Sequence, residues 1–295
     1  MMKQTRPWAY ILTLLAVLTV TSCGKLSKEQ KEKNNQLIET AHKQKDYNRL
    51  LQLADSMEAA NGISQAKACY WRGYAYDHLK QRKEAEDNWR KSMEAALASN
   101  SEDDQQMYAK SASYLANMFC MERDFQSALQ LAAPVVQKLQ EQKRDTTSNY
   151  INLLIYVGLS RVGLGTDEKE AEGNFELALK KHQENIKRHR TDAAYKDAIA
   201  GLINISYHCV RVGKYQEALY YTRNFGELLA EYEQRPGVDA AYIDKQVGRY
   251  TIYKTQAQKK LGQEKEAATT YEAFLATNFS KSAEAKKLIE EYQIQ

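Results

Sequence analysis

The fold is decided by residues 73–92, GYAYDHLKQRKEAEDNWRKS. A small and an aromatic residue, Gly73 and Tyr76, precede a turn, and a second set of small, aromatic and small residues follows it: Ala85, Trp89 and Ser92. Small residues at helical spacing let two helices approach each other closely, while the aromatic residues fill the space toward a neighbouring pair. These residues therefore predict a helical hairpin that stacks on other hairpins.

The same spacing recurs along the chain. It is clear in residues 116–135 and 206–225, and it is weaker in residues 46–54, 158–178 and 261–274. Each copy carries one small or apolar anchor residue near the start of its second helix: Leu50, Ala85, Ala128, Ala171, Ala218 and Ala267. Successive anchors are 35, 43, 43, 47 and 49 residues apart. Six helical hairpins are therefore predicted.

This pattern resembles the tetratricopeptide repeat (TPR) family, whose repeat is a helical hairpin of about 34 residues. The resemblance covers residues 28–295 and implies an all-α domain, an α-α solenoid of about six hairpins. The wider spacing of the anchors predicts longer helices or loops than the family repeat has. Residues 281–292 place apolar side chains on one helical face and are expected to form a C-terminal capping helix. Another α-α solenoid or an irregular helical bundle is the alternative, and both are also all-α.

The composition agrees with a helical chain. Its 295 residues include 42 Lys+Arg and 38 Asp+Glu but only 3 Pro and 13 Gly, so few residues interrupt a helix. This balance excludes an all-β protein and long disordered or collagen-like stretches. The formal net charge of +4 is too small for a dedicated nucleic-acid binder, so no nucleic-acid partner is predicted. Pro134 falls inside the second helix of the third hairpin and is expected to kink that helix or end it early.

The N-terminus has the composition of a secretory signal. Two cations, Lys3 and Arg6, precede an apolar run over residues 8–20 that is too short to span a bilayer comfortably. Residues 20–23, Val-Thr-Ser-Cys, resemble the lipobox of bacterial lipoproteins, which implies that residues 1–22 are removed and that Cys23 is lipidated. An ordinary signal or an uncleaved membrane anchor is the alternative.

A short tether follows the proposed lipidation site. Residues 23–27 contain Cys23 and the tether, and Ser27 with Gln30 forms a capping-box pattern that predicts a helix start near Lys28. A lipid anchor on so short a tether would hold the repeat domain at a membrane surface. The predicted location is the cell envelope of a Gram-negative bacterium, with the protein anchored on the periplasmic side.

No motif in the chain carries catalytic chemistry. The sequence lacks H-E-x-x-H, G-x-S-x-G and G-x-x-x-x-G-K, and its five histidines are scattered. Cys69, Cys120 and Cys209 lack zinc or redox spacing and are expected to be buried small hydrophobic residues. The prediction is a non-enzymatic protein with no cofactor and no metal site. Hydrolysis of a cell-envelope polymer by carboxylates distant in sequence is a minor alternative.

The TPR resemblance also implies a groove, because the first helix of each hairpin in that family lines a concave surface that holds peptides or partner helices. Transferring those positions gives ten candidate residues for the peptide groove: Tyr70, Tyr74, Asp77, His78, Lys110, Asn117, Tyr207, Arg211, Arg249 and Gln256. Tyrosine supplies contact area and a phenolic hydrogen bond, and Lys or Arg can neutralise a ligand carboxylate. A mixed aromatic and basic lining of this kind suits a protein or peptide ligand.

These features predict a membrane-anchored TPR-like lipoprotein that acts as a protein- or peptide-binding adaptor. The alternative function is the extracytoplasmic sensor region of a membrane signalling receptor of the sensor histidine kinase type. Helical repeats preceded by a short apolar segment also resemble such regions. In that case the native chain would continue beyond Gln295 into a second apolar span and a kinase.

Overall fold

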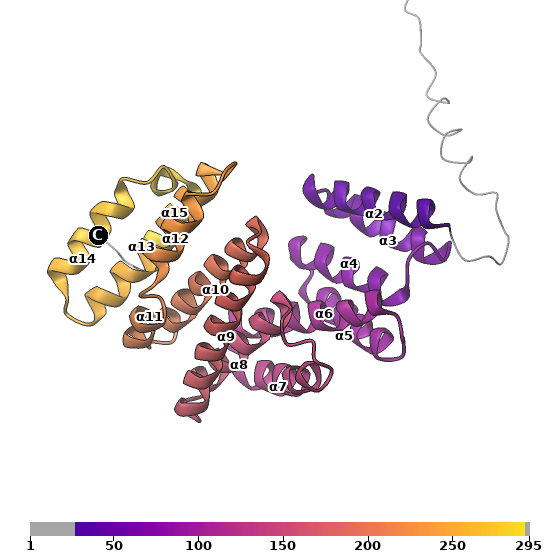
Figure 1. Ribbon diagram of the computed structural model, residues 1–295, viewed down its shortest axis with the longest axis horizontal. Coiled ribbons are helices and arrows are strands. Elements are labelled where there is room, and N and C mark those ends of the chain that lie inside the picture. Colours follow the sequence, from indigo (N-terminus) through magenta and orange to yellow (C-terminus); the bar gives the residue numbers. More distant parts are fainter. Residues whose placement is uncertain (1–26, 293–295) are drawn as a thin grey trace, which may run out of the picture.

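The computed structural model describes residues 27–292, and the regular structure of that part of the chain is helical throughout. Its helices follow one another as six hairpins and a terminal helix (Figure 1). The first three hairpins are α2 (Lys28–Lys43) with α3 (Tyr47–Ala59), α4 (Gln65–His78) with α5 (Arg82–Leu97), and α6 (Glu102–Met121) with α7 (Phe125–Glu141).

The fourth hairpin is α8 (Ser148–Leu164) with α9 (Glu168–His189). The fifth is α10 (Asp192–Arg211) with α11 (Tyr215–Tyr221) and α12 (Phe225–Glu233), and the sixth is α13 (Ala240–Lys260) with α14 (Glu264–Leu275). A short 3-10 helix, η1 (Phe279–Lys281), then leads into α15 (Ala283–Tyr292). The predicted all-α solenoid of six hairpins with a C-terminal helix is confirmed.

The first helices of the hairpins form an inner layer. Each inner helix from α4 through α6, α8 and α10 contacts the next, as far as α13. In Figure 1, α2–α6 form one arm and α10–α15 form another, with α7, α8 and α9 between them. These two sets of helices are called the N-terminal arm and the C-terminal arm below.

The predicted anchors and glycines hold each hairpin together. All six anchor residues, from Leu50 to Ala267, are at most 1% exposed. A Cβ atom on Gly73 would lie 2.5 Å from Cδ1 of Trp89, and one on Gly158 would lie 2.7 Å from Cε1 of Phe175. Because real Cβ contacts are not this short, only glycine permits these helices to approach so closely. The small-to-aromatic spacing read from the sequence therefore has a direct steric meaning.

The predicted start of the first helix is also confirmed. Ser27 precedes α2, and its hydroxyl accepts a hydrogen bond from the backbone N–H of Gln30 at 3.1 Å. The side chain of Gln30 does not complete a capping box in the expected way. It donates instead to Oδ1 of Asn34 at 3.1 Å. The helix is therefore capped by the serine alone.

The second helices of the third and fifth hairpins each contain an irregular position. Pro134 does not end α7, which continues to Glu141, and Pro134 and Gln130 are both exposed, so the carbonyl left without its N–H donor lies near water. The second helix of the fifth hairpin is broken between α11 and α12. There the carbonyl of Thr222 accepts a hydrogen bond from the hydroxyl of Tyr250 at 3.1 Å, and Phe225 stacks on the same ring at 4.0 Å. This contact with α13 takes the place of a continuous helix.

Burial also sets the state of the titratable core residues. Cys69, Cys120 and Cys209 are free and buried, as predicted. Burial raises the pKa of the Cys120 thiol to about 12, which keeps it protonated. Two histidines, His182 and His208, are also buried, and burial lowers their pKa values to about 4 and about 3. Both imidazoles are therefore neutral at physiological pH.

Replacing Gly73 by alanine is expected to lower the free energy of unfolding by about 1–3 kcal/mol, because the new methyl group overlaps the buried indole of Trp89. Gly173 provides the matched control. It is an exposed residue inside α9 whose Cβ would meet no atom within 4 Å, so Gly173→Ala should raise the free energy of unfolding by about 0.5–1 kcal/mol through helix propensity. Urea unfolding of both variants measures the difference, and shifts of the same sign would contradict the steric account.

The buried histidines predict acid sensitivity. The pKa of His182 is about 4 in the folded chain and about 6.5 in the unfolded chain, so the unfolded state binds more protons between these values. Stability is therefore full above pH 6.5 and falls toward pH 4, by about 1 kcal/mol per pH unit from this residue. His208 acts in the same direction over a window that extends to about pH 3.

Urea unfolding at pH 6 and pH 5 checks this prediction. His182→Leu should remove about half of the pH dependence, whereas replacing the exposed His189 on the same helix by leucine should leave the dependence unchanged. Equal pH slopes in the two variants would show that His182 is not buried as a neutral imidazole.

Candidate functional site

The ten predicted groove residues separate into two groups, one on each arm. Six lie on the N-terminal arm: Tyr70, Tyr74, Asp77 and His78 on α4, with Lys110 and Asn117 on α6. Four lie on the C-terminal arm: Tyr207 and Arg211 on α10, with Arg249 and Gln256 on α13. The structure therefore brings them together as two sites rather than as one continuous groove.

Tyr74 is the centre of the N-terminal group. Its hydroxyl lies 3.0 Å from Nε2 of His42, a residue of α2, and its ring lies edge-on to Tyr114 of α6 at 5.7 Å. The ring of His78 stacks in parallel on Tyr47 of α3 with centroids 4.5 Å apart. Three successive hairpins thus contribute to one aromatic surface. His78 is exposed and Tyr74 is half-buried, so this surface is open to solvent.

Three aromatic residues of the inner helices were absent from the sequence prediction of the groove. Trp71, Tyr114 and Tyr253 occupy the same position of the repeat, fourteen residues before the anchors Ala85, Ala128 and Ala267. Each packs on the inner helix of the preceding hairpin: Trp71 on His42, Tyr114 on Tyr74, and Tyr253 on Tyr207, with centroids 5.3–5.7 Å apart. The repeat of this aromatic position in the sequence is the signal that identifies them.

Two lysines gather on the inner face of the N-terminal arm. Nζ of Lys67 donates to Oδ1 of Asn35 at 2.6 Å, and Nζ of Lys110 lies 5.8 Å from the ring centre of Tyr70. Burial, and then the nearby charge of Lys67, lower the pKa of Lys110. Neither lysine has a carboxylate within 4 Å among residues 27–292. The more distant charges of Asp103 and Glu39 act in the opposite direction, but burial and the charge of Lys67 outweigh them.

Two of the predicted residues are covered. Tyr70 is 6% exposed and Gln256 is 8% exposed. Tyr70 lies against Tyr114 and Lys110, and burial raises its pKa. The transfer of repeat positions did not account for Tyr114 of the next hairpin, which covers Tyr70. Gln256 is buried on the last inner helix, so neither side chain is open to a ligand in this structure.

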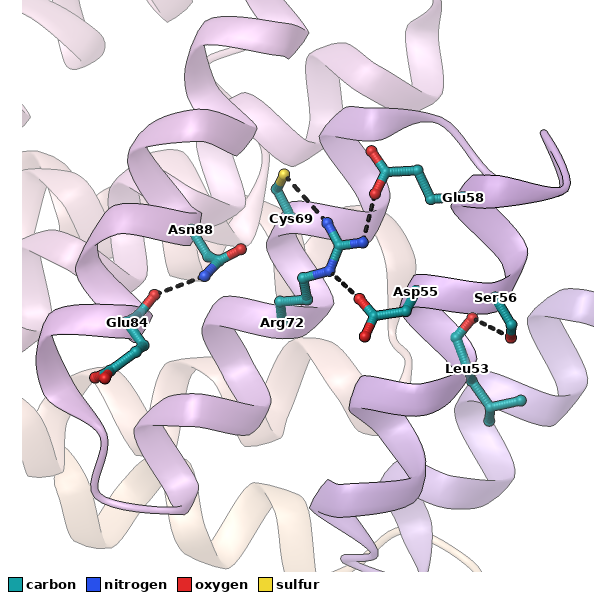
Figure 2. A network of polar contacts seen from close by, with 8 residues as sticks. All are labelled: Leu53, Asp55, Ser56, Glu58, Cys69, Arg72, Glu84 and Asn88. Carbon is teal, nitrogen blue, oxygen red and sulfur yellow. Dashed lines mark hydrogen bonds and ion pairs between the residues drawn. The ribbon is translucent and has the colours of Figure 1, made fainter.

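A network on another side of α4 holds this helix in place (Figure 2). Nε of Arg72 donates to Asp55 at 2.6 Å, and the same guanidinium pairs with Glu58, both from α3. Its Nη1 also lies 3.8 Å from the sulfur of Cys69. This planar group thus fixes α4 against the first hairpin, and the fixed helix positions Tyr74 and His78.

The two arms are joined at the C-terminal ends of α6 and α10. Nη1 of Arg211 donates to the carbonyl of Met121 at 3.0 Å, and Nη2 of Arg123 donates to the carbonyl of Arg211 at 2.9 Å. Arg211 therefore caps the last turn of α6, and Arg123 caps the last turn of α10. Arg211 also lies over the ring of Tyr207 at 5.2 Å. Its guanidinium is thus already engaged within the chain.

The hairpin between the arms exposes little inner surface. Relative to Gly158, Ile155 and Leu159 of α8 stand where Tyr70 and Tyr74 stand relative to Gly73, and each is 1% exposed. Helices α6 and α10 contact α8 from its two sides. This buried segment separates the inner face of the N-terminal arm from that of the C-terminal arm.

Neither a metal site nor a membrane-spanning helix is found within residues 27–292. No group of three His, Cys, Asp or Glu side chains within residues 27–292 is placed to hold a metal ion. Over the same residues, every helix is too short or too polar to cross a bilayer. A surface hollow of about 700 Å³ beside α13 and α14 contains none of the predicted groove residues, and its apolar lining includes Val238, Ile243 and Val247.

No protein-family model and no curated protein matches this sequence. Solved structures do match the fold. BtubC (BKLC) from P. vanneervenii has a TM-score of 0.51 at 13% identity, over 92% of this chain and 94% of that one. The apo form of RapI has a TM-score of 0.54 at 12% identity, over 89% and 99%. A Rap protein complexed with Competence and Sporulation Factor has a TM-score of 0.53 at 15% identity, over 97% and 81%. The chain therefore has a TPR-like helical repeat fold.

Proposed function

We propose that this chain is a non-enzymatic adaptor of the bacterial cell envelope, a member of the TPR family that binds a protein or peptide on the inner face of its N-terminal arm. That face is called the N-terminal inner face, and it comprises Lys67, Tyr74, His78, Lys110 and Asn117. All five side chains are half-buried or exposed, so a ligand can reach them.

The pair Lys67 and Lys110 is the observation that carries this proposal. Neither ammonium group has a carboxylate within 4 Å among residues 27–292, and burial with the charge of Lys67 lowers the pKa of Lys110 against the opposing charges of Asp103 and Glu39. A carboxylate of a bound segment would relieve this repulsion and accept charge-assisted hydrogen bonds from both lysines. The favoured ligand is therefore a peptide segment that carries an acidic group.

The aromatic surface beside these lysines supports a peptide ligand rather than a small anion. Tyr74 and His78 offer ring faces and edges to apolar side chains, and the amide of Asn117 matches the hydrogen-bonding groups of a peptide main chain. A Rap protein of similar fold is complexed with Competence and Sporulation Factor, which supports a binding role for this type of fold.

The envelope location and the lipid anchor rest on the sequence alone. Cys23 and the preceding signal lie outside the described residues. The non-enzymatic assignment likewise rests on the absence of catalytic motifs from the sequence. Loss of palmitate incorporation in a Cys23→Ala variant expressed in a Gram-negative host would support the lipid anchor.

Selection from a random peptide library on the full chain tests the proposed binding surface. Acidic peptides should be enriched, and Lys110→Gln should weaken the selected peptides by about 10-fold, which is about 1.4 kcal/mol for one lost charge-assisted contact. Lys91→Gln, a change of an exposed lysine on the outer helix α5, should leave their affinity unchanged.

Titration calorimetry at low and physiological salt measures these affinities. Equal affinity for the wild-type chain and the Lys110→Gln variant, or selection of peptides without acidic residues, would contradict the assignment of the N-terminal inner face.

A further inference from the structure

The terminal helix α15 packs on the C-terminal arm through four apolar side chains. Ala285 and Leu288 are buried, and Ile289 and Tyr292 are partly buried against the same core. Its first turn is held by charge, because Glu284 pairs with Nζ of Lys245 at 2.6 Å and lies 3.6 Å from Nε of Arg249. Lys245 and Glu284 are both more than two-fifths exposed, so water competes for this ion pair. The attachment of the first turn is therefore weak.

The last turn of α15 lies beside the predicted groove residues of α10. The ring of Tyr292 is edge-on to Tyr253 of α13 at 6.0 Å. Burial, and then the neighbouring Tyr253, Glu291 and Tyr207, raise the pKa of Tyr292, and the charge of Arg211 opposes this shift. Helix α15 thus packs on α13 at Arg249 and Tyr253, and the charges of Tyr207 and Arg211 on α10 act on its last turn, so these four residues are taken as one surface. This surface, together with Lys245, is called the C-terminal inner face.

Two polar groups at the contact between α15 and this face lack hydrogen-bond partners in the described part of the chain. The hydroxyl of Tyr292 and Nε of Arg249 are buried without a hydrogen-bond partner in the described part of the chain. The face also carries three cations, Arg211, Lys245 and Arg249, whereas Glu284 is the one α15 carboxylate within 4 Å of them among residues 27–292. Helix α15 itself adds two lysines at positions 286 and 287. Its charge therefore complements this face poorly.

The chain provides a hinge before α15. Phe279 of η1 is buried against Gly248, where a Cβ atom would lie 2.4 Å from its ring, and the carboxylate of Asp244 accepts the N–H groups of Asn278 and Phe279 at 2.9 and 2.7 Å. Ser282 then adopts an extended conformation that ends the short helix. Helix α15 can leave while η1 stays anchored, so its release disrupts no other hairpin.

We propose that the C-terminal inner face binds an acidic amphipathic helix of a partner protein, and that α15 covers this face until the partner displaces it. Two side chains of α15 indicate which groups this face can bind. The carboxylate of Glu284 lies near Lys245 and Arg249, and the ring of Tyr292, two helical turns later, packs on Tyr253. A partner helix with further carboxylates would give Lys245 and Arg249 separate partners in place of the single Glu284 that they share. Because α8 separates the two inner faces, this proposal stands independently of binding at the N-terminal inner face.

Competition between α15 and a peptide tests the proposal on the full chain. The probe is a lactam-stapled, fluorescein-labelled peptide with the sequence of residues 282–292, in which the lysines at 286 and 287 are replaced by glutamate. Glu284→Lys places a cation against Lys245 and Arg249 and should release α15, so the probe should bind this variant at least 10-fold more tightly than the wild type. Glu290→Lys, a change of an exposed residue on the same helix, should bind the probe like the wild type.

A second substitution locates the binding surface. Adding Arg249→Glu to the Glu284→Lys variant should lower probe affinity by at least 10-fold, and the probe with its original lysines should bind more weakly than the acidic one. Fluorescence anisotropy measures affinity, and circular dichroism confirms that each variant is folded. Equal binding to the wild type and Glu284→Lys, no binding to either, or binding that survives Arg249→Glu would overturn the proposal.

Discussion

Helix α8 is covered by α6, α7, α9 and α10, and this burial fixes how the two halves of the solenoid meet. Of residues 150–160, only Asn152 is not buried. The approach of α10 depends on Gly201, where a Cβ atom would lie 2.6 Å from Nε2 of His182 and 3.3 Å from Cδ1 of Ile155. A helix that is apolar on all faces has no favourable position at the surface, so the neighbouring hairpins must enclose it.

This enclosure has a functional consequence, because it divides one inner surface into two. The N-terminal inner face presents an aromatic surface with two lysines that have no carboxylate within 4 Å among residues 27–292, whereas the C-terminal inner face is basic and already holds a helix of the same chain. The reciprocal contacts of Arg123 and Arg211 join the ends of α6 and α10 between them. The two faces can therefore differ in ligand, and occupation of one does not require the other.

The sequence predicted the hairpins correctly because their determinants are local. Gly73 faces Trp89 and Gly158 faces Phe175 within single hairpins, so the spacing alone identifies the contact. The predicted groove was less accurate because its residues also depend on neighbouring hairpins. Tyr70 is covered by Tyr114 of the next inner helix, a contact that a position-by-position transfer omits.

Contacts between distant hairpins were harder to predict from the sequence. Residues 146–160 contain no charged side chain, and such a run indicates a helix that is buried on all faces. The repeat spacing alone does not carry this signal. The bond from Arg211 to the carbonyl of Met121 and the placement of α15 beside α10 leave no spacing pattern, because they arise from the curvature of the whole stack. Such contacts become visible only when the inner helices are placed in space.

Hydrogen–deuterium exchange of the native chain, resolved by helix, tests the central role of α8 most directly. Amides in the enclosed α8 should exchange slowest and close to the rate set by global unfolding, whereas α2 and α15 at the ends of the stack should exchange fastest through local opening. Exchange of α8 as rapid as that of the terminal helices would contradict the account, because it would mean that the two arms do not enclose it.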